Sequence, residues 1–237
     1  MYHDLFMPGR NVIKTYLENG IYHIYNRGVN KNLIFQDEQD YAVFLSYLKQ
    51  YLLPKNEDQL MKTLLNPSIT YFEKEKILRL LKLNNFSDEI KLLAYCIMPN
   101  HFHFLLQQKS RNGIDSFMNS LGTRYTQFNN KKYQRVGPLY QSVYKAISVE
   151  TDEQLLHLSR YIHQNPLTSY TPKDREMFAL FSQPSSLPEY LGQRKTEWIH
   201  SEVILAYFSK TNPKLSYESF VNQTEDLSII TKILIDL

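Results

Sequence analysis

The stretch Tyr95-Cys-Ile-Met-Pro-Asn-His-Phe-His-Phe-Leu-Leu106 decides the fold and points to a site. An apolar run leads into a Pro-Asn turn, and a second run then begins with alternating polar and apolar residues. Two such runs joined by a short turn predict an antiparallel hairpin over about 90–98 and 101–108. Because side chains alternate between the faces of a strand, His101 and His103 should share one face of the sheet.

The two histidines suggest a metal site. Two imidazoles side by side at the start of a buried strand are costly unless they have a polar partner. A shared metal ion is the simplest partner, since histidine is the commonest metal ligand. The alternative is a pair at a sheet edge, hydrogen-bonded to backbone and solvent. In a metal site the ring nitrogens of His101 and His103 should converge to roughly 3–4 Å, given metal–nitrogen bonds of about 2.0–2.1 Å.

The composition predicts a globular, cytoplasmic protein. The chain has 237 residues, of which 43% are apolar, enough for one domain with elaborations or at most two small ones. No apolar run reaches the ~18 residues of a membrane span, and the first residues lack the regions of a signal peptide. The lone cysteine, Cys96, allows no internal disulfide, which fits a reducing compartment.

Positive charge is concentrated between residues 109 and 145, although the net charge of the whole chain is only +3. This basic window holds seven Lys or Arg residues against one acidic residue, Asp115, and aromatic residues are interleaved with them. Basic side chains for phosphates and flat rings for unpaired bases are typical of single-strand binding. A solvated basic face is the alternative, and composition alone favours it. If the window binds DNA, it should face the same side as the histidines.

The order of predicted elements indicates the fold class. We expect a strand at 20–28, a helix at 38–53, a helical pair at 58–65 and 71–83, the hairpin, a helix at 113–129, a strand at 138–149 and a helix at 152–165 that is stopped by Pro166. Without the helical pair, the first six elements form a split βαβ, ferredoxin-like arrangement, an α+β fold with an antiparallel sheet and helices on one face. We therefore expect a domain over 1–170 with an insert at about 55–88, followed by a wrapping tail at 171–237.

The last predicted helix carries a polar stripe. His157, Tyr161 and Asn165 follow one another at intervals of four residues, so they lie on one face of the helix. This face could lie beside the two histidines. A metal held by two imidazoles and an amide oxygen, with a phenol alongside, suits phosphoryl transfer to a tyrosine. Spacing alone does not single out Tyr161 among the eighteen tyrosines of the chain.

Four blocks of the sequence resemble one known family. The runs GIYHIYNRGVNKNLIF, LLAYCIMPNHFHFLL, GPLYQSVYKAISV and LSRYIHQNPL are similar to those of the single-tyrosine HUH transposases, that is, the IS200-like enzymes and their REP-associated relatives. The resemblance covers about residues 18–192. A histidine–hydrophobic–histidine triplet alone is a weak signal. It becomes strong here, because MPN precedes it and RYIHQNP follows at the right distance.

The resemblance implies roles for individual residues. It implies that His101 and His103 are metal ligands, that Asn165 is the third ligand, and that Tyr161 is the nucleophile. The tyrosines of the basic window would instead serve packing and DNA contact. Mg or Mn is the expected metal, since an amide and a scissile phosphate supply oxygen ligands, and two histidines would also accept Zn.

The implied activity is metal-dependent DNA transposition. The enzyme would nick single-stranded, hairpin-forming DNA, hold the 5′ phosphate on Tyr161 and transfer it to a 3′ hydroxyl. The IS200-like branch implies a homodimer, which we expect, whereas the REP-associated branch is compatible with a monomer. No membrane partner is expected. The candidate DNA-binding residues are Arg27, Lys31, Arg124, Lys131, Lys132, Arg135 and Lys145.

Two other functions stay open at this point. One is a domesticated, non-catalytic nucleic-acid-binding protein of the same fold. The other is a small metal-dependent hydrolase that uses water and in which Tyr161 is structural. A covalent protein–DNA adduct would separate the transposase from both.

Overall fold

The computed structural model describes residues 16–168, 185–223 and 229–230. Its centre is a four-stranded sheet in the order β2-β3-β1-β4, in which every neighbouring pair is antiparallel. The strands are β1 (Ile21–Arg27), β2 (Ile90–Met98), β3 (His101–Gln108) and β4 (Lys145–Val149). This is the strand arrangement of a split βαβ, ferredoxin-like α+β fold, so the predicted fold class is confirmed.

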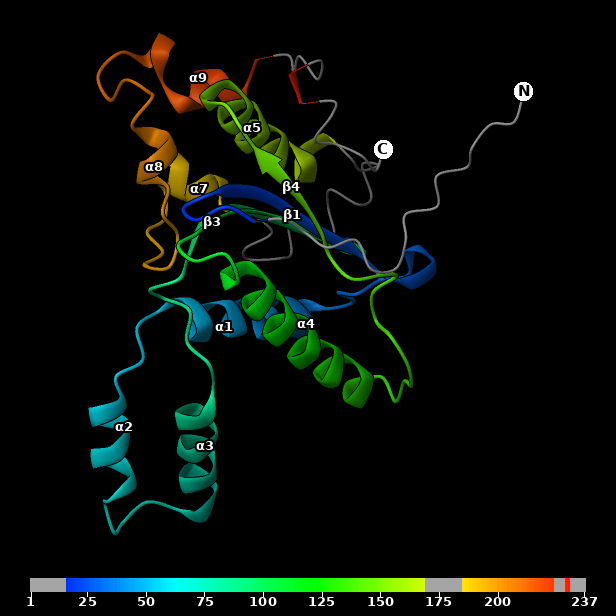
Figure 1. Ribbon diagram of the computed structural model, residues 1–237, viewed down its shortest axis with the longest axis vertical. Coiled ribbons are helices and arrows are strands. Elements are labelled where there is room, and N and C mark those ends of the chain that lie inside the picture. The colour runs from blue at the N-terminus through cyan, green and yellow to red at the C-terminus, as the bar shows by residue number, and fades with distance from the viewer. Residues whose placement is uncertain (1–15, 169–184, 224–228, 231–237) are drawn as a thin grey trace.

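Helices cover both faces of this sheet (Figure 1). Two of them, α1 (Glu38–Leu52) and α4 (Gly113–Lys132), lie on one face, and α5 (Asp152–Thr168) crosses the other. The remaining helices are α2 (Glu57–Leu64), α3 (Tyr71–Lys82), α7 (Leu187–Tyr190), α8 (Glu202–Leu205), α9 (Tyr217–Val221), and the short η1 (Val29–Lys31) and η2 (Pro213–Leu215). Among the described residues, no helix has the length and apolarity needed to cross a bilayer.

Strand alternation divides the apolar residues into two cores. Phe102 and Phe104 of β3 point to the core shared with α1 and α4, whereas Leu105 points to the core shared with α5. On the α5 side the helix contributes its apolar stripe, which consists of Leu155, Leu158 and Ile162. Burial of large apolar side chains on both faces fixes α5 against the sheet.

Three predicted boundaries differ from the structure by more than one residue. The strand expected at 138–149 is confined to 145–149, because the chain before it folds across the end of β1 through an isolated bridge between Gly28 and Tyr140. The helix expected to end at 129 continues to Lys132, whose side chain is bound by two carboxylates of the α1 region. Pro166 does not stop α5, since a proline close to the helix end removes only one backbone hydrogen bond.

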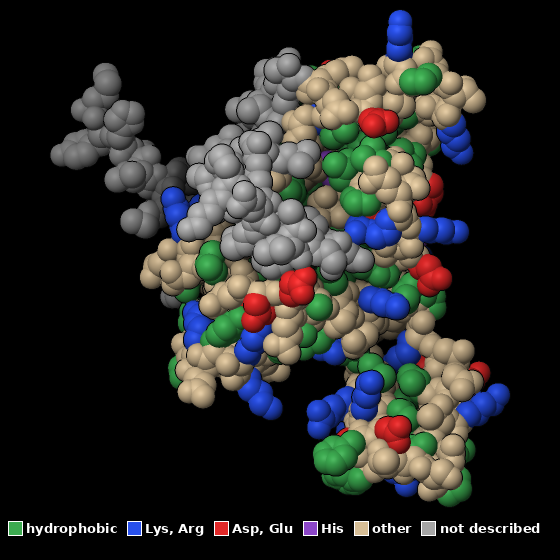
Figure 2. All heavy atoms as spheres, turned by 180° about the vertical axis from the view of Figure 1, so that it is seen from behind, with side chains coloured by type: hydrophobic (Ala, Val, Ile, Leu, Met, Phe, Trp, Pro, Cys, Tyr) green, Lys and Arg blue, Asp and Glu red, His purple; other side chains and the backbone are tan. Residues whose placement is uncertain are grey.

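The insert and the tail lie on different parts of the core. Helices α2 and α3 form an arm that extends away from the sheet, with Leu65, Tyr71 and Phe72 among its exposed apolar side chains (Figures 1 and 2). Residues 185–223 pack along β2 and α5, with bridges from Ser185 to Cys96 and from Ile199 to Leu92. The predicted domain boundary at 170/171 lies outside the described residues, as do 171–184, 224–228 and 231–237 of the predicted tail.

Candidate active site

The two predicted histidines lie together on the α5 face of the sheet. In the β1–β3 pairing, His101 is opposite Arg27 and His103 is opposite Tyr25. The rings of His101 and His103 are perpendicular, at 89°, with centroids 5.0 Å apart. Phe102 lies on the other face, as the alternation predicted.

Helix α5 brings Tyr161 and Asn165 to these histidines. It begins at a cap in which the backbone N–H of Gln154 donates to Oγ1 of Thr151 (3.1 Å). The ring of Tyr161 meets that of His103 edge-on, at 87° and 5.6 Å between centroids. One turn later, the Asn165 side chain is hydrogen-bonded to His101.

His157, the first residue of the predicted polar stripe on α5, does not contact His101 or His103 in any interaction that the described residues show. His157 instead has Nδ1 2.9 Å from an Nη atom of Arg160, and its ring contacts Phe220 of α9. The predicted residues that the structure brings together are therefore His101, His103, Tyr161 and Asn165.

The protonation of His101 follows from its neighbours. Its Nδ1 is 2.6 Å from Oδ1 of Asn100, whose Nδ2 donates to the carbonyl of Lys31 (3.3 Å). An amide oxygen can only accept, so Nδ1 carries the proton and Nε2 keeps its lone pair. Burial, and then the positive charge of Arg27, lower the pKa of His101 to about 4, although its hydrogen bond with Asn165 acts in the opposite direction and raises the pKa. His101 is therefore neutral at neutral pH.

His103 is neutral for similar reasons. Burial, and then the neighbouring His23 and His101, hold the pKa of His103 well below its ordinary range. Neutral imidazoles are the form that binds metal ions. Both rings thus have the protonation state that a ligand needs.

Two residues of β1 complete the site, and sequence reasoning missed them. Nε2 of His23 lies 2.9 Å from Nδ1 of His103, and His23 is only 1% exposed. The ring of Tyr25 stacks on His103 with centroids 5.8 Å apart. Their alternation in the first strand places them on one face, but only the pairing of β1 with β3 shows that this is the histidine face.

The donor set fits a divalent ion. His101 and His103 offer imidazole nitrogens, Asn165 offers an amide oxygen, and the Nδ1 atom of each ring is already engaged by a neighbour, as is usual for metal-bound histidines. Within the described ranges, no group of three or more His, Cys, Asp or Glu residues could hold a metal ion. A metal site here therefore depends on the amide of Asn165.

Three of the predicted basic residues lie on or near the histidine side. Lys145 of β4 pairs with Tyr25 and has its Nζ 5.6 Å from the centre of that ring. Nε of Arg27 donates to Oε1 of Gln141 (3.2 Å). Lys31 follows β1 in a tight loop that requires Gly28, because a Cβ there would collide with the backbone of Asn32.

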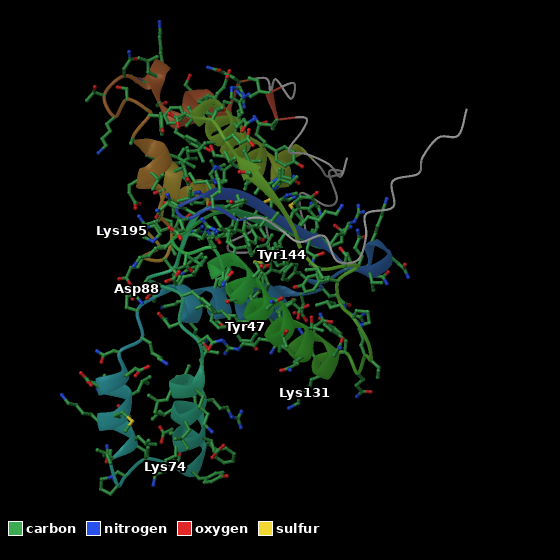
Figure 3. The ribbon with its side chains drawn as sticks, in the orientation of Figure 1. Tyr47, Lys74, Asp88, Lys131, Tyr144 and Lys195 are labelled. Atoms are coloured by element: carbon green, nitrogen blue, oxygen red, sulfur yellow. The ribbon has the colours of Figure 1, made fainter. Side chains whose placement is uncertain are left out.

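The other predicted basic residues lie elsewhere. Figure 3 places Lys131 near the end of α4, on the side of the sheet opposite α5. The guanidinium of Arg124 stacks on Tyr47 at 3.7 Å and an Nη atom donates to Gln50 (2.8 Å). The expectation that the basic window faces the histidines is wrong for α4, because its apolar stripe (Phe117, Leu121 and Tyr125) packs on the opposite face of the sheet.

Two further predicted basic residues have intramolecular partners. Nζ of Lys132 lies 2.6 Å from Asp37 and 2.8 Å from Asp40, and an Nη atom of Arg135 donates to Oδ1 of Asn129 (3.2 Å). In the same window, Tyr125 donates to the carbonyl of Ile34 (2.8 Å) and Tyr144 to Asp115.

Part of the chain is similar to known transposases. The family model described as "Transposase IS200 like" matches residues 64–165. A solved structure of a REP-associated tyrosine transposase bound to a REP hairpin is 11% identical, covers 87% of this chain and 96% of its own, and has a TM-score of 0.45. The crystal structure of a candidate transposase from Deinococcus radiodurans R1 is 16% identical in sequence. The match covers 67% of this chain and 97% of the other, with a TM-score of 0.27.

No curated protein matches the chain in sequence. The family match nevertheless spans both histidines, Tyr161 and Asn165. The family match agrees with the resemblance of the motifs: the segment that carries the candidate site is similar to IS200-like transposases.

Proposed function

We propose that this protein is a metal-dependent transposase that cleaves and rejoins single-stranded DNA through a phosphotyrosine intermediate on Tyr161. The observation that supports it most directly is the meeting of α5 with β3. Tyr161 lies edge-on to His103 while Asn165 is hydrogen-bonded to His101. A nucleophile and an oxygen ligand thus come from one helix, and two nitrogen ligands come from one strand.

The proposed reaction consists of two successive transfers of one phosphate, and neither step needs a nucleotide cofactor. The phenol of Tyr161 gives its proton to water, and its oxygen forms a bond to the scissile phosphorus. The bond from phosphorus to the 3′ oxygen of the preceding nucleotide breaks, and that oxygen takes up a proton. A 3′ hydroxyl then loses its proton to water and attacks the same phosphorus. The bond from phosphorus to Tyr161 breaks, the phenol oxygen takes up a proton, and the strand is rejoined, since the tyrosine ester conserves the bond energy.

His101, His103 and Asn165 would hold a divalent ion, proposed to be Mg or Mn, with Zn also suited to the two imidazoles. When bound, the ion would neutralise charge on the scissile phosphate and polarise it. The chain's own contribution is orientation. Apolar contacts hold α5 against the sheet, and this fixes Tyr161 beside His103. Both histidines stay neutral because they are buried.

We propose single-stranded, hairpin-forming DNA as the partner. Arg27, Lys31 and Lys145 are the basic residues assigned to phosphates near the scissile bond. Lys131 and Arg135 would contact only a more distant part of the DNA. Arg124 is stacked on Tyr47 and Lys132 is held by two carboxylates, so these two are the weakest of the seven candidates.

The organisation of the protein is also a proposal. Residues 1–170 would form the catalytic domain, 171–237 the wrapping tail, and the active form would be a homodimer. Light scattering at micromolar concentration tests the last of these, since a monomer mass would contradict it.

One experiment tests the proposed activity against both rivals. The purified protein is incubated with Mn²⁺ and labelled single-stranded hairpin oligonucleotides from the DNA that flanks its gene. A transposase gives a labelled adduct that survives denaturation and is lost on protease treatment. A non-catalytic binding protein shifts the DNA without cleaving it, and a water-using hydrolase cleaves it without forming an adduct. Either of these outcomes would overturn the proposal.

A further inference from the structure

His103 contacts a third histidine, His23, which is not one of the four predicted site residues and has no role in the proposed reaction. His23 lies in β1 and pairs directly with Leu105, so it is the diagonal neighbour of His103 on the α5 face. Its Nε2 is 2.9 Å from Nδ1 of His103, and the two rings are stacked at 18° with centroids 5.1 Å apart. His23 is 1% exposed and His103 is 7% exposed, so water competes little with this contact.

The contact leaves only one nitrogen of His103 for any other partner. Nδ1 faces His23, so Nε2 is the atom that can bind an ion. Binding requires the lone pair of Nε2, and a neutral imidazole has one proton, which must then reside on Nδ1. Nδ1–H can donate to His23 only if Nε2 of His23 is the acceptor and its own proton is on the other nitrogen.

We propose that His23 is a positioning residue that holds His103 in the Nδ1–H tautomer and fixes the orientation of its ring, leaving Nε2 available to a divalent ion. This inference rests on the proposed metal site and adds a residue to it. It makes the two ligands alike: Asn100 accepts from His101, and His23 accepts from His103. Such outer partners of ligating histidines commonly change metal affinity about 10–100-fold when removed.

The alternative is that His23 only provides a hydrogen-bond partner for the buried ring of His103 and has no effect on metal binding. Three variants distinguish the two. His23→Gln keeps an acceptor, Oε1, near the position of Nε2. His23→Leu keeps the bulk and removes the acceptor. Tyr22→Phe is the matched control, because Tyr22 is the adjacent buried residue of β1, its side chain lies on the other face, and its hydroxyl accepts one hydrogen bond, from the N–H of Leu17 (2.7 Å).

The first measurement is the Kd for Mn²⁺ alone, by titration calorimetry or by the loss of the free-ion electron paramagnetic resonance signal. His23→Leu should weaken binding about 10–100-fold, His23→Gln should stay within a few-fold of the unmutated protein, and Tyr22→Phe should leave the Kd unchanged. Unchanged affinity in His23→Leu would overturn the inference. Equal losses in His23→Leu and Tyr22→Phe would also overturn it, because the effect would then be structural.

The second measurement needs neither metal binding nor a variant. Two-bond ¹H–¹⁵N correlation spectra of the metal-free protein report which nitrogen of His103 is protonated. The Nδ1–H tautomer is expected, and an Nε2–H tautomer would overturn the inference. If the unmutated protein fails to bind Mn²⁺ while His103 is in the Nδ1–H form, the proposed metal site fails and the positioning role of His23 stands. The two failures are therefore distinguishable.

Discussion

Asn165 is hydrogen-bonded to His101, one helical turn after Tyr161 meets His103. These contacts join a helix near residue 160 to a strand near residue 100, and each polar residue of the helix has its own histidine. A shift of α5 by one residue would move both partners off the histidines, because consecutive positions on a helix point about 100° apart. The buried apolar stripe of α5 prevents such a shift.

The nucleophile is tested by Tyr161→Phe. This change keeps the ring and its contact with His103 but removes the attacking oxygen, so the covalent adduct and strand cleavage should both fall below detection. Folding and DNA binding should change little. Adduct formation is measured on denaturing gels with Mn²⁺ and labelled hairpin oligonucleotides.

Tyr144→Phe is the matched control for this change. Tyr144 is buried and donates to Asp115 on the other face of the sheet, so its loss should lower stability and leave the adduct intact. An adduct that persists in Tyr161→Phe and vanishes in Tyr144→Phe would show that the nucleophile is misassigned.

The path of the DNA is tested by two sets of charge removals. Replacing Arg27, Lys31 and Lys145 by Gln should weaken single-strand binding and reduce the salt slope by about 0.7 for each lost phosphate contact. The comparison set, Lys131 and Arg135 replaced by Gln, removes two charges and should reduce the slope by less for each charge removed. Fluorescence anisotropy at several salt concentrations gives both slopes. A larger effect per charge in the second set would place the DNA along the end of α4.

Lys132 is expected to contribute to stability rather than to DNA binding. Its ammonium lies between Asp37 and Asp40, and Asp40 is fully buried. Lys132→Met would leave the buried carboxylate without its cation, at a cost of about 1–3 kcal/mol in the free energy of unfolding. Urea denaturation measures this cost.

Lys131→Met is the control for that experiment. Lys131 is the exposed neighbour of Lys132, and its loss should change the free energy of unfolding by less than about 0.5 kcal/mol. Equal effects of the two substitutions would mean that the ion pairs with Asp37 and Asp40 contribute nothing measurable.

The burial of His101 predicts a pH dependence of the metal-free protein. Its pKa falls from an ordinary 6.5 to about 4 in the folded state, first through burial and then through Arg27. As the pH falls through 6.5, the unfolded state binds the proton first, so the stabilising contribution is complete above about 6.5 and is lost between about 6.5 and 4. Neutral His101 thus favours the folded state only above this window.

Resolved histidine signals in a nuclear magnetic resonance titration with chelator present test this prediction. His101 should titrate near pH 4, and Arg27→Gln should raise its pKa, because a positive charge is removed. Titration near 6.5 in the folded protein would contradict the buried geometry.

The sequence by itself determined the local features of the site. Alternation along 101–106 fixed His101 and His103 on one face, because strand periodicity is a property of the backbone. The four-residue spacing placed Tyr161 and Asn165 on one stripe of α5 for the same kind of reason. The hairpin boundaries at 90–98 and 101–108 also agree with the structure, since an apolar run and a Pro-Asn turn are local signals.

Only the tertiary structure decided what lies around these residues. Alternation sorts side chains within a strand but does not say which helix covers which face, so the position of α4 opposite the histidines could not be read from its charges. The pairing of β1 with both β3 and β4 brought His23, Tyr25 and Lys145 to the site, because strand order depends on contacts between distant segments. The contact of His23 with His103 therefore depends on the pairing of β1 with β3 and could not be predicted from the sequence of either strand.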